Sequence, residues 1–135
     1  AGGLEMSWPG GRAEIAREGR HRKFLAAVEQ LSYNGDYGFE RGQRVLYVTE
    51  RAVFRRAKAG LELIEIAPGI DLERDVMAHM EFRPAVAADC RAMDARLFKP
   101  EPMGLDRDLA EKPRQYRSDR VRDWHAKRKI HKAAD

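Results

Sequence analysis

The fold is decided by two neighbouring stretches: residues 44–54, Arg-Val-Leu-Tyr-Val-Thr-Glu-Arg-Ala-Val-Phe, and residues 60–76, Gly-Leu-Glu-Leu-Ile-Glu-Ile-Ala-Pro-Gly-Ile-Asp-Leu-Glu-Arg-Asp-Val. Residues 45–48 are apolar throughout, and three of the four are β-branched or aromatic. This composition predicts a short strand that is buried on both faces.

A hairpin and a helix are predicted after this strand. A second strand begins at Val53-Phe54, the polar residues 55–60 form a turn, and residues 61–66 run back as the partner strand. Pro68-Gly69 ends that strand.

The helix is predicted over residues 71–82, with Asp71 as its N-cap and Pro84 shortly after its end. Three apolar residues recur at every fourth position and so share one helical face: Leu72, Val76 and Met80. A strand, a hairpin and a helix in this order predict an α/β fold.

The first sixteen residues predict another hairpin, with its turn at Pro9-Gly10-Gly11. Apolar and polar residues alternate on both sides of that turn; the apolar ones are Leu4, Met6, Trp8, Ala13 and Ile15. The connector that follows, residues 17–23, carries four cations and is interpreted as a solvated loop, with a phosphate or carboxylate site as the less favoured alternative.

Two segments have no clear period. Residues 24–33 suit a helix by propensity, although Val28, Leu31 and Tyr33 would also suit a strand, and residues 34–38 indicate a break. Residues 83–105 contain three prolines in an otherwise extended run, so we expect their apolar side chains to pack along the body or along another domain or subunit.

The basic excess lies entirely in the last thirty residues. Residues 106–135 contain ten Lys or Arg and six Asp or Glu, whereas residues 1–105 contain sixteen of each. We therefore expect a neutral body over 1–105 and a basic, partly helical tail over 106–135, with a thin apolar stripe through Val121 and Trp124.

The chain carries few groups with recognisable chemistry. The single cysteine, Cys90, cannot form an internal disulfide, and no apolar run spans a bilayer, so a cytoplasmic protein is expected. The four histidines lack metal-ligand spacing: His21, His79, His125 and His131. Glu50 and Glu65 lie in or near strands, where exposed charge is a better interpretation than a nucleophile or base.

Residues 42–54, 60–76 and 93–98 (Met-Asp-Ala-Arg-Leu-Phe) resemble the carboxyl-terminal end of family I CoA-transferases. The resemblance is to the acyl-CoA:acetate/3-ketoacid CoA-transferases, including acetate and propionate enzymes, and to the succinyl-CoA:3-ketoacid enzymes of ketone body metabolism. Residues 18–24 and 28–35 extend it, so that it covers about residues 1–105.

The resemblance implies the terminal portion of a NagB/RpiA-like sheet domain, in which a largely parallel sheet ends in β-hairpins and a closing helix. It also implies that residues 29–33 form a strand. In the family, a glutamate attacks an acyl-CoA thioester, and the resulting acyl-glutamyl anhydride gives an enzyme–CoA thioester before a second acid takes the CoA. No counterpart of that glutamate motif, or of the oxyanion-stabilising loop, occurs in this sequence.

These implications define the expected site and partners. We expect no catalytic residue, no metal ligand and no bound cofactor in this chain, with a CoA thioester as substrate of the complete enzyme. The chain begins at Ala1-Gly2-Gly3 without Met, which suggests an absent upstream part. The expected partner is the remainder of the CoA-transferase or a homologous subunit, in a homo-oligomer and away from membranes.

Two other functions remain open. One is a small nucleic-acid-binding protein, whose phosphate contacts would come from the basic tail and whose stacking would come from Tyr116 and Trp124. The cations of that tail are Arg114, Arg117, Arg120, Arg122, Lys127, Arg128, Lys129 and Lys132. The neutral body and the six interleaved acids disfavour it. The other is a non-catalytic interaction module derived from a truncated gene.

Overall fold

The computed structural model describes residues 2–112, which fall into two compact units, one up to Pro102 and one from Met103 onward. The first unit contains a two-stranded and a four-stranded sheet, and the second contains the helix α2 (Leu105–Glu111). Residues 113–135 lie outside the described part. The predictions made for the tail therefore stay predictions: its partly helical structure, the phosphate contacts of its cations, the stacking of its aromatic residues, and the roles of His125 and His131.

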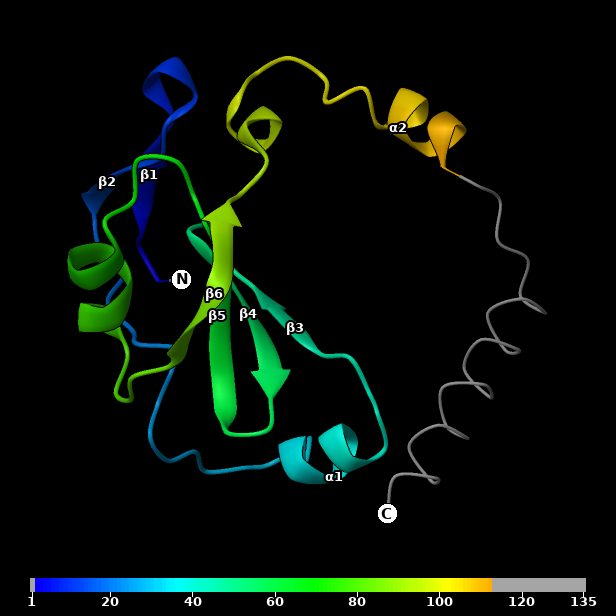
Figure 1. Cartoon of the computed structure of the whole chain (residues 1–135). Helices are drawn as coiled ribbons and strands as arrows, with labels where there is room; N and C mark the ends of the chain where they lie inside the picture. Colours follow the sequence, from blue (N-terminus) through cyan, green and yellow to red (C-terminus); the bar gives the residue numbers. More distant parts are fainter. Residues whose placement is uncertain (1, 113–135) are drawn as a thin grey trace. The chain divides into compact units, whose positions relative to one another are not determined.

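The first unit is built from short elements along the chain (Figure 1). Their bounds are β1 Glu5–Ser7, η1 Pro9–Gly11, β2 Glu14–Arg17, α1 Gly35–Glu40, β3 Leu46–Val48, β4 Ala52–Ala57, β5 Gly60–Ile66, η2 Leu72–Val76, η3 Met77–His79, β6 Ala85–Ala92 and η4 Ala95–Phe98.

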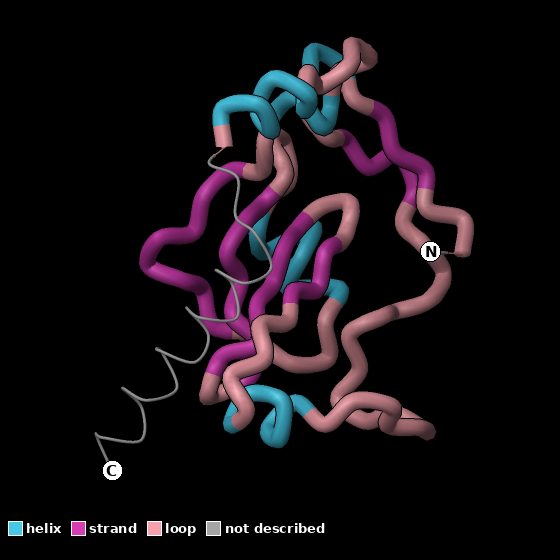
Figure 2. The backbone as a smooth tube through the Cα atoms, turned by 90° about the vertical axis from the view of Figure 1, so that its right-hand side faces the viewer, coloured by secondary structure: helices cyan, strands magenta, loops and turns pink. Residues whose placement is uncertain are grey.

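The four-stranded sheet has the order β3-β4-β5-β6; Figure 1 labels these strands, and Figure 2 shows the strands of the chain in magenta from another side. The pairs β3–β4 and β4–β5 are antiparallel, and the pair β5–β6 is parallel. The mixed α/β class is confirmed, but a largely parallel sheet is not what the described strands form. A parallel pair needs a crossover, and the segment containing η2 and η3 supplies it between β5 and β6.

The central hairpin is longer than expected. Ala57 pairs with Gly60, so that Lys58-Ala59 alone form the turn, and the predicted polar turn over 55–60 is wrong. Arg55 and Arg56 belong to β4, and both charges are paired: Arg55 Nε donates to Glu62 Oε2 of β5 at 2.6 Å, and Arg56 forms an ion pair with Asp36 of α1. Polarity alone does not end a strand whose cross-strand neighbour carries the opposite charge.

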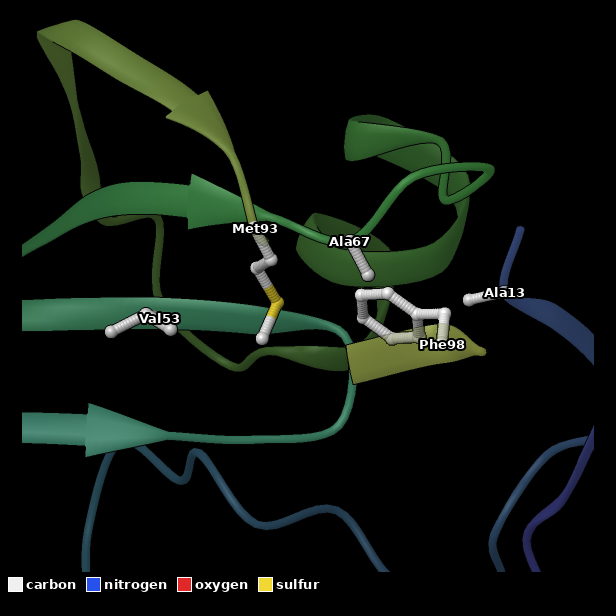
Figure 3. Close-up of a cluster of buried hydrophobic side chains, with 5 residues drawn as sticks. All are labelled: Ala13, Val53, Ala67, Met93 and Phe98. Carbon is white, nitrogen blue, oxygen red and sulfur yellow. The ribbon is translucent and has the colours of Figure 1, made fainter. Parts of the chain in front are cut away.

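Two hydrophobic clusters cover the sheet. The first consists of Ala13, Val53, Ala67, Met93 and Phe98, and Figure 3 shows the Phe98 ring beside the side chains of Ala13 and Ala67. The second consists of Ala52, Phe54, Leu63, Val76 and Met80, with Phe24 and Tyr47 packed against it. Val53 and Phe54 are consecutive in β4 and enter different clusters, as the alternation of a strand requires.

The amino-terminal hairpin is confirmed, with β1 and β2 antiparallel across the turn at residues 9–11. It is fastened to the sheet where Ala13 N donates to Pro68 O at 2.7 Å. Gly69, at φ +96°, sits so close that a Cβ there would lie 2.6 Å from Ala13 O. The Pro68-Gly69 pair therefore ends β5 and lets two backbones meet.

The predicted helix over 71–82 is only partly correct. Asp71 does cap it, accepting a hydrogen bond from Arg74 N at 2.8 Å, but the helix consists of a single π turn, η2, followed by the 3₁₀ turn η3. Val76 and Met80 are buried and Leu72 is half-buried. Two of the three residues expected on one helical face are therefore buried. The wider π turn η2 and the tighter 3₁₀ turn η3 replace a regular helix.

The segment before β3 also departs from expectation. Residues 25–33 form neither the helix favoured by propensity nor the strand implied by the resemblance, and they are exposed. Residues 34–38, expected as a break, begin α1, whose N-cap Asn34 accepts from Tyr37 N at 3.0 Å. Local capping therefore overrides the turn-forming composition of this stretch.

Residues 83–105 contain a strand that the sequence did not predict. β6 adds to β5 in parallel, and Met93 and Phe98 beyond it enter the first cluster. The expectation that apolar side chains of this segment pack along the body is confirmed for these two residues. Among the described residues, no helix is long and apolar enough to cross a bilayer.

Candidate functional site

The candidate site is a cavity of about 120 Å³ in the first unit. Its walls come from Leu4 and from three segments: residues 18–24, the turn between β3 and β4 with the start of β4, and residues 75–80. Apolar side chains of the second cluster form one wall, including Phe54, Val76 and Met80. Most of the other lining residues are charged or polar, so the site has the mixed lining of a binding pocket.

The turn between β3 and β4 sets the position of the central cation, Arg51. The Thr49 hydroxyl oxygen accepts from Arg51 N at 3.3 Å and from Ala52 N at 3.0 Å, and the hydroxyl donates to Ala52 O at 2.8 Å. A threonine that closes a turn with its own side chain leaves the following residues in one conformation. The Arg51 side chain is thereby directed toward residues 18 and 75.

Arg51 connects three parts of the chain. Its guanidinium donates to both carboxylate oxygens of Glu18, at 2.7 Å and 3.1 Å, and to Asp75 O at 2.7 Å. Its side chain is only 12% exposed. A bidentate pair of this kind is among the stronger polar interactions in proteins, so it fixes the connector against the sheet.

Glu18 is held as an anion by its neighbours. The Arg51 hydrogen bond is the largest cause that lowers the pKa of Glu18, opposed by burial and assisted by the charges of Arg51 and His79. His79 Nε2 lies 3.2 Å from the same carboxylate. A carboxylate that is ionised and occupied in this way is a structural anchor rather than a proton acceptor at neutral pH.

Asp75 is the second carboxylate at the cavity, and it is buried. Arg74 donates to both of its oxygens, at 2.7 Å and 2.8 Å, and Asp71 N donates to one of them at 2.8 Å. The Arg74 hydrogen bond is the first cause that lowers the pKa of Asp75, with burial opposing it. Asp71 and Asp75 thus both accept hydrogen bonds from backbone N–H groups at the amino-terminal end of the η2 turn, as in a capping box.

The two glutamates considered from the sequence are placed apart. Glu50 lies at the rim of the cavity, 3.6 Å from Arg51 Nη2, with 43% of its side chain exposed. Glu65 lies in β5, where it accepts from Arg91 Nη2 at 2.7 Å. The structure does not bring them together, and both are paired with arginine.

The remaining candidates have ordinary surroundings. Burial, followed by the charges of Asp89 and Glu65, raises the pKa of Cys90, which disfavours a reactive thiolate. His21 lines the cavity and is exposed, and His79 pairs with Glu18. No group of three or more potential metal ligands occurs within residues 2–112.

The cluster of Glu18, Arg51, Asp75 and His79 was not predicted. Glu18 and Arg51 are 33 residues apart, and Arg51 and Asp75 are 24 apart, so no local spacing connects them. The nearest sequence signal was the charged connector 17–23, of which residues 20–23 are exposed as a solvated loop should be.

Comparison with known proteins adds the missing context. The chain is 46% identical over 102 residues to a caffeate CoA-transferase of Acetobacterium woodii. It is 42% identical over 105 residues to the acetate CoA-transferase YdiF of Escherichia coli K12. These matches cover 76% and 78% of this chain but 20% of each relative, so the chain spans about a fifth of their length. No protein-family model matches the sequence.

The solved structures that the fold matches are also of a CoA-transferase. The fold resembles an acyl-CoA transferase of E. coli O157:H7 (YdiF), described as a thioester complex with CoA, with a TM-score of 0.74 and 42% identity. The apoenzyme of the same protein matches with the same TM-score. Each match covers 77% of this chain and 20% of the other.

Proposed function

Because this chain is a relative of the CoA-transferases that corresponds to a carboxyl-terminal part of them, we propose that it supplies this part of an enzyme moving CoA between an acyl-CoA and a short-chain carboxylic acid. The observation that carries the proposal is the joint match of sequence and fold to the same enzyme. The fold match has 42% identity and a TM-score of 0.74, and it covers 77% of the chain.

The geometry of the cavity supports a structural, non-catalytic role for this chain in that enzyme. Glu18 and Asp75 are ionised and engaged by arginines, which leaves neither carboxylate placed to attack a thioester. The reacting glutamate therefore belongs, in this proposal, to the portion of the enzyme that this chain does not match. The chain alone is then inactive, and its binding of CoA requires that portion.

The substrate class follows from the relatives. The named relatives act on caffeate and acetate, and one neighbouring structure holds CoA as a thioester. We propose a short-chain carboxylate as acceptor, with 3-ketoacids as the second class, and no further cofactor. The proposed setting is a cytoplasmic homo-oligomer in which this chain contacts the remainder of the enzyme or a homologous subunit.

The test restores the missing portion. The full 135-residue chain is mixed with a polypeptide containing the unmatched part of E. coli YdiF, and transfer of CoA from acetyl-CoA to propionate is measured. We expect neither polypeptide to be active alone and the mixture to be active, because the covalent steps need the glutamate of the unmatched part.

A covalent fusion of the same two parts controls for weak association. The intact E. coli enzyme serves as the positive control for the assay. A folded fusion that shows no exchange beside an active intact enzyme would contradict the proposed function, as would exchange by this chain alone.

A further inference from the structure

The edge strand β3 presents apolar side chains to solvent. Leu46 is 58% exposed and Val48 is 68% exposed. Tyr47 between them packs on the second cluster, so its side chain lies on the other face of the strand. β3 pairs with β4 on one side, and within the described residues no strand pairs with its other side.

The register shows which peptide groups face the open side. Val45 O accepts from Arg56 N at 3.0 Å, and Thr49 N donates to Ala52 O at 3.0 Å. Because hydrogen-bonded and non-hydrogen-bonded pairs alternate in an antiparallel ladder, the N–H and C=O groups of Leu46 and Val48 point away from β4. The open edge therefore offers two donors and two acceptors beside two exposed apolar side chains.

The opposite edge of the sheet, β6, differs in its protection. It carries Asp89 and Arg91, whose side chains are 79% and 76% exposed, and its register against β5 is irregular. Charges and irregular pairing are the usual devices that prevent a sheet edge from adding another strand. β3, with the sequence Leu-Tyr-Val, has none of them.

We propose that an extended segment from the unmatched four fifths of the CoA-transferase adds to the open edge of β3 as a further strand. This inference rests on the proposed function, since it takes the partner from the length of the relatives that this chain leaves uncovered. Strand addition would satisfy the outward peptide groups of Leu46 and Val48 and cover their side chains. The added segment would carry apolar residues opposite those two positions.

The experiment uses the full chain and, as a separate polypeptide, the unmatched part of E. coli YdiF. Their dissociation constant is measured for the unmodified chain and for the double variant Leu46→Lys, Val48→Lys. Two charges on the edge should weaken the complex by about tenfold or more, because lysine on an edge strand opposes pairing.

A matched control is available in α2. Leu105 and Leu109 are 51% and 65% exposed, so the double variant Leu105→Lys, Leu109→Lys makes the same chemical change outside the sheet. We expect its dissociation constant to equal that of the unmodified chain. Val86→Lys, at an exposed position of β6, tests the other edge in the same way.

Hydrogen exchange on the unmodified chain gives an independent readout if the lysine variant fails to fold. On formation of the complex, the amides of Leu46 and Val48 should exchange more slowly by about tenfold or more, since a new ladder would protect them. The amide of Val86 should not change.

The outcomes separate the two proposals. Tight binding with no protection at Leu46 and Val48 would overturn the strand addition and leave the proposed function standing. Absence of binding, together with an inactive fusion, would overturn both. Protection of these amides in the chain alone that stays unchanged when the unmatched part is added would overturn this partner and identify a second copy of the chain instead.

Discussion

β3 and β4 are adjacent in the sequence and hydrogen-bonded to each other, and all of β3 and the first three residues of β4 are apolar, yet their apolar side chains differ in burial. Val53 and Phe54 of β4 are 6% and 1% exposed, whereas Leu46 and Val48 of β3 are 58% and 68% exposed. The side chains of β4 find partners on both faces of the sheet, from the amino-terminal hairpin, the η2 turn and the segment after β6.

The difference separates two uses of apolar residues. Those of β4 hold this chain together, because burial of apolar surface is the main stabilising contribution to folding. The exposed side chains of β3, Leu46 and Val48, contribute little to the folding of the chain while they stay in water. A substitution in β4 should therefore change stability, and one in β3 should change association.

The largest effect is expected for Phe54→Ala. The ring is almost fully buried and lies 5.0 Å from the ring of Phe24, centroid to centroid. Removal of a buried phenylalanine costs about 3–5 kcal/mol of unfolding free energy, which could unfold a domain of this size outright. Urea unfolding followed by circular dichroism measures it, with Leu46→Ala as the control.

A change of less than about 1 kcal/mol for Phe54→Ala would contradict the burial of β4, because such values are typical of surface substitutions. An equal loss for Leu46→Ala would remove the contrast between the two strands.

The second effect concerns the tie between β4 and the rest of the unit. Arg51→Met keeps the aliphatic stem but deletes the hydrogen bonds to Glu18 and to Asp75 O. Hydrogen bonds to charged groups contribute about 1.5–3 kcal/mol each, and partial solvation of Glu18 reduces this, so a loss of about 2 kcal/mol is expected.

Arg17→Met is the matched control, since Arg17 pairs with Glu5 on the surface and both side chains are more than half exposed. Its effect on urea unfolding should be below about 0.5 kcal/mol. Equal losses for the two variants would show that the Arg51 pair has no special role.

A smaller effect is expected from pH. The pKa values of Glu18 and Asp75 are lowered in the folded chain from their ordinary values of 4.5 and 3.8. A lowered folded-state pKa gives stability that is present above the ordinary value and lost as pH falls through the folded one. The free energy of unfolding should therefore decrease below about pH 4.5.

The same measurement on Arg51→Met provides the control for the pH effect. Because Arg51 is the largest cause of the Glu18 shift, this variant should lose less stability between pH 7 and pH 3 than the unmodified chain. Parallel pH curves for the two proteins would contradict the assignment.

The sequence was informative where the determining interactions are local. The amino-terminal hairpin, the end of β5 at Pro68-Gly69 and the Asp71 cap depend on neighbouring residues, and each was predicted correctly. The family resemblance was also confirmed, because it depends on several motifs in one order.

The failures depend on distant contacts. Burial of residues 45–48 on both faces was wrong because an apolar pattern does not say where its partner lies. The strand β6 was missed because its alanines, interrupted by polar residues, give no period, and its pairing with β5 fixes it. Arg51 contacts Asp75, which lies 24 positions away in the sequence, and Glu18, which lies 33 positions away. Sequence patterns do not detect contacts over such separations.

The smallest effect on stability is expected for substitutions of the exposed residues of β3, which should have the largest effect on association. Leu46→Thr and Val48→Thr together keep the β propensity of β3 but remove exposed apolar groups. Because these side chains stay in water, the free energy of unfolding should change by less than about 0.5 kcal/mol. Sedimentation should show less self-association, since the exposed apolar edge favours contact between copies.

The double variant Leu105→Thr, Leu109→Thr makes the corresponding change in α2, and we expect it to sediment like the unmodified chain. If the β3 variant instead lost as much stability as Phe54→Ala, its side chains would already be partnered within the chain. The contrast between the two strands would then reflect packing inside this molecule, and the open edge would have no partner to explain.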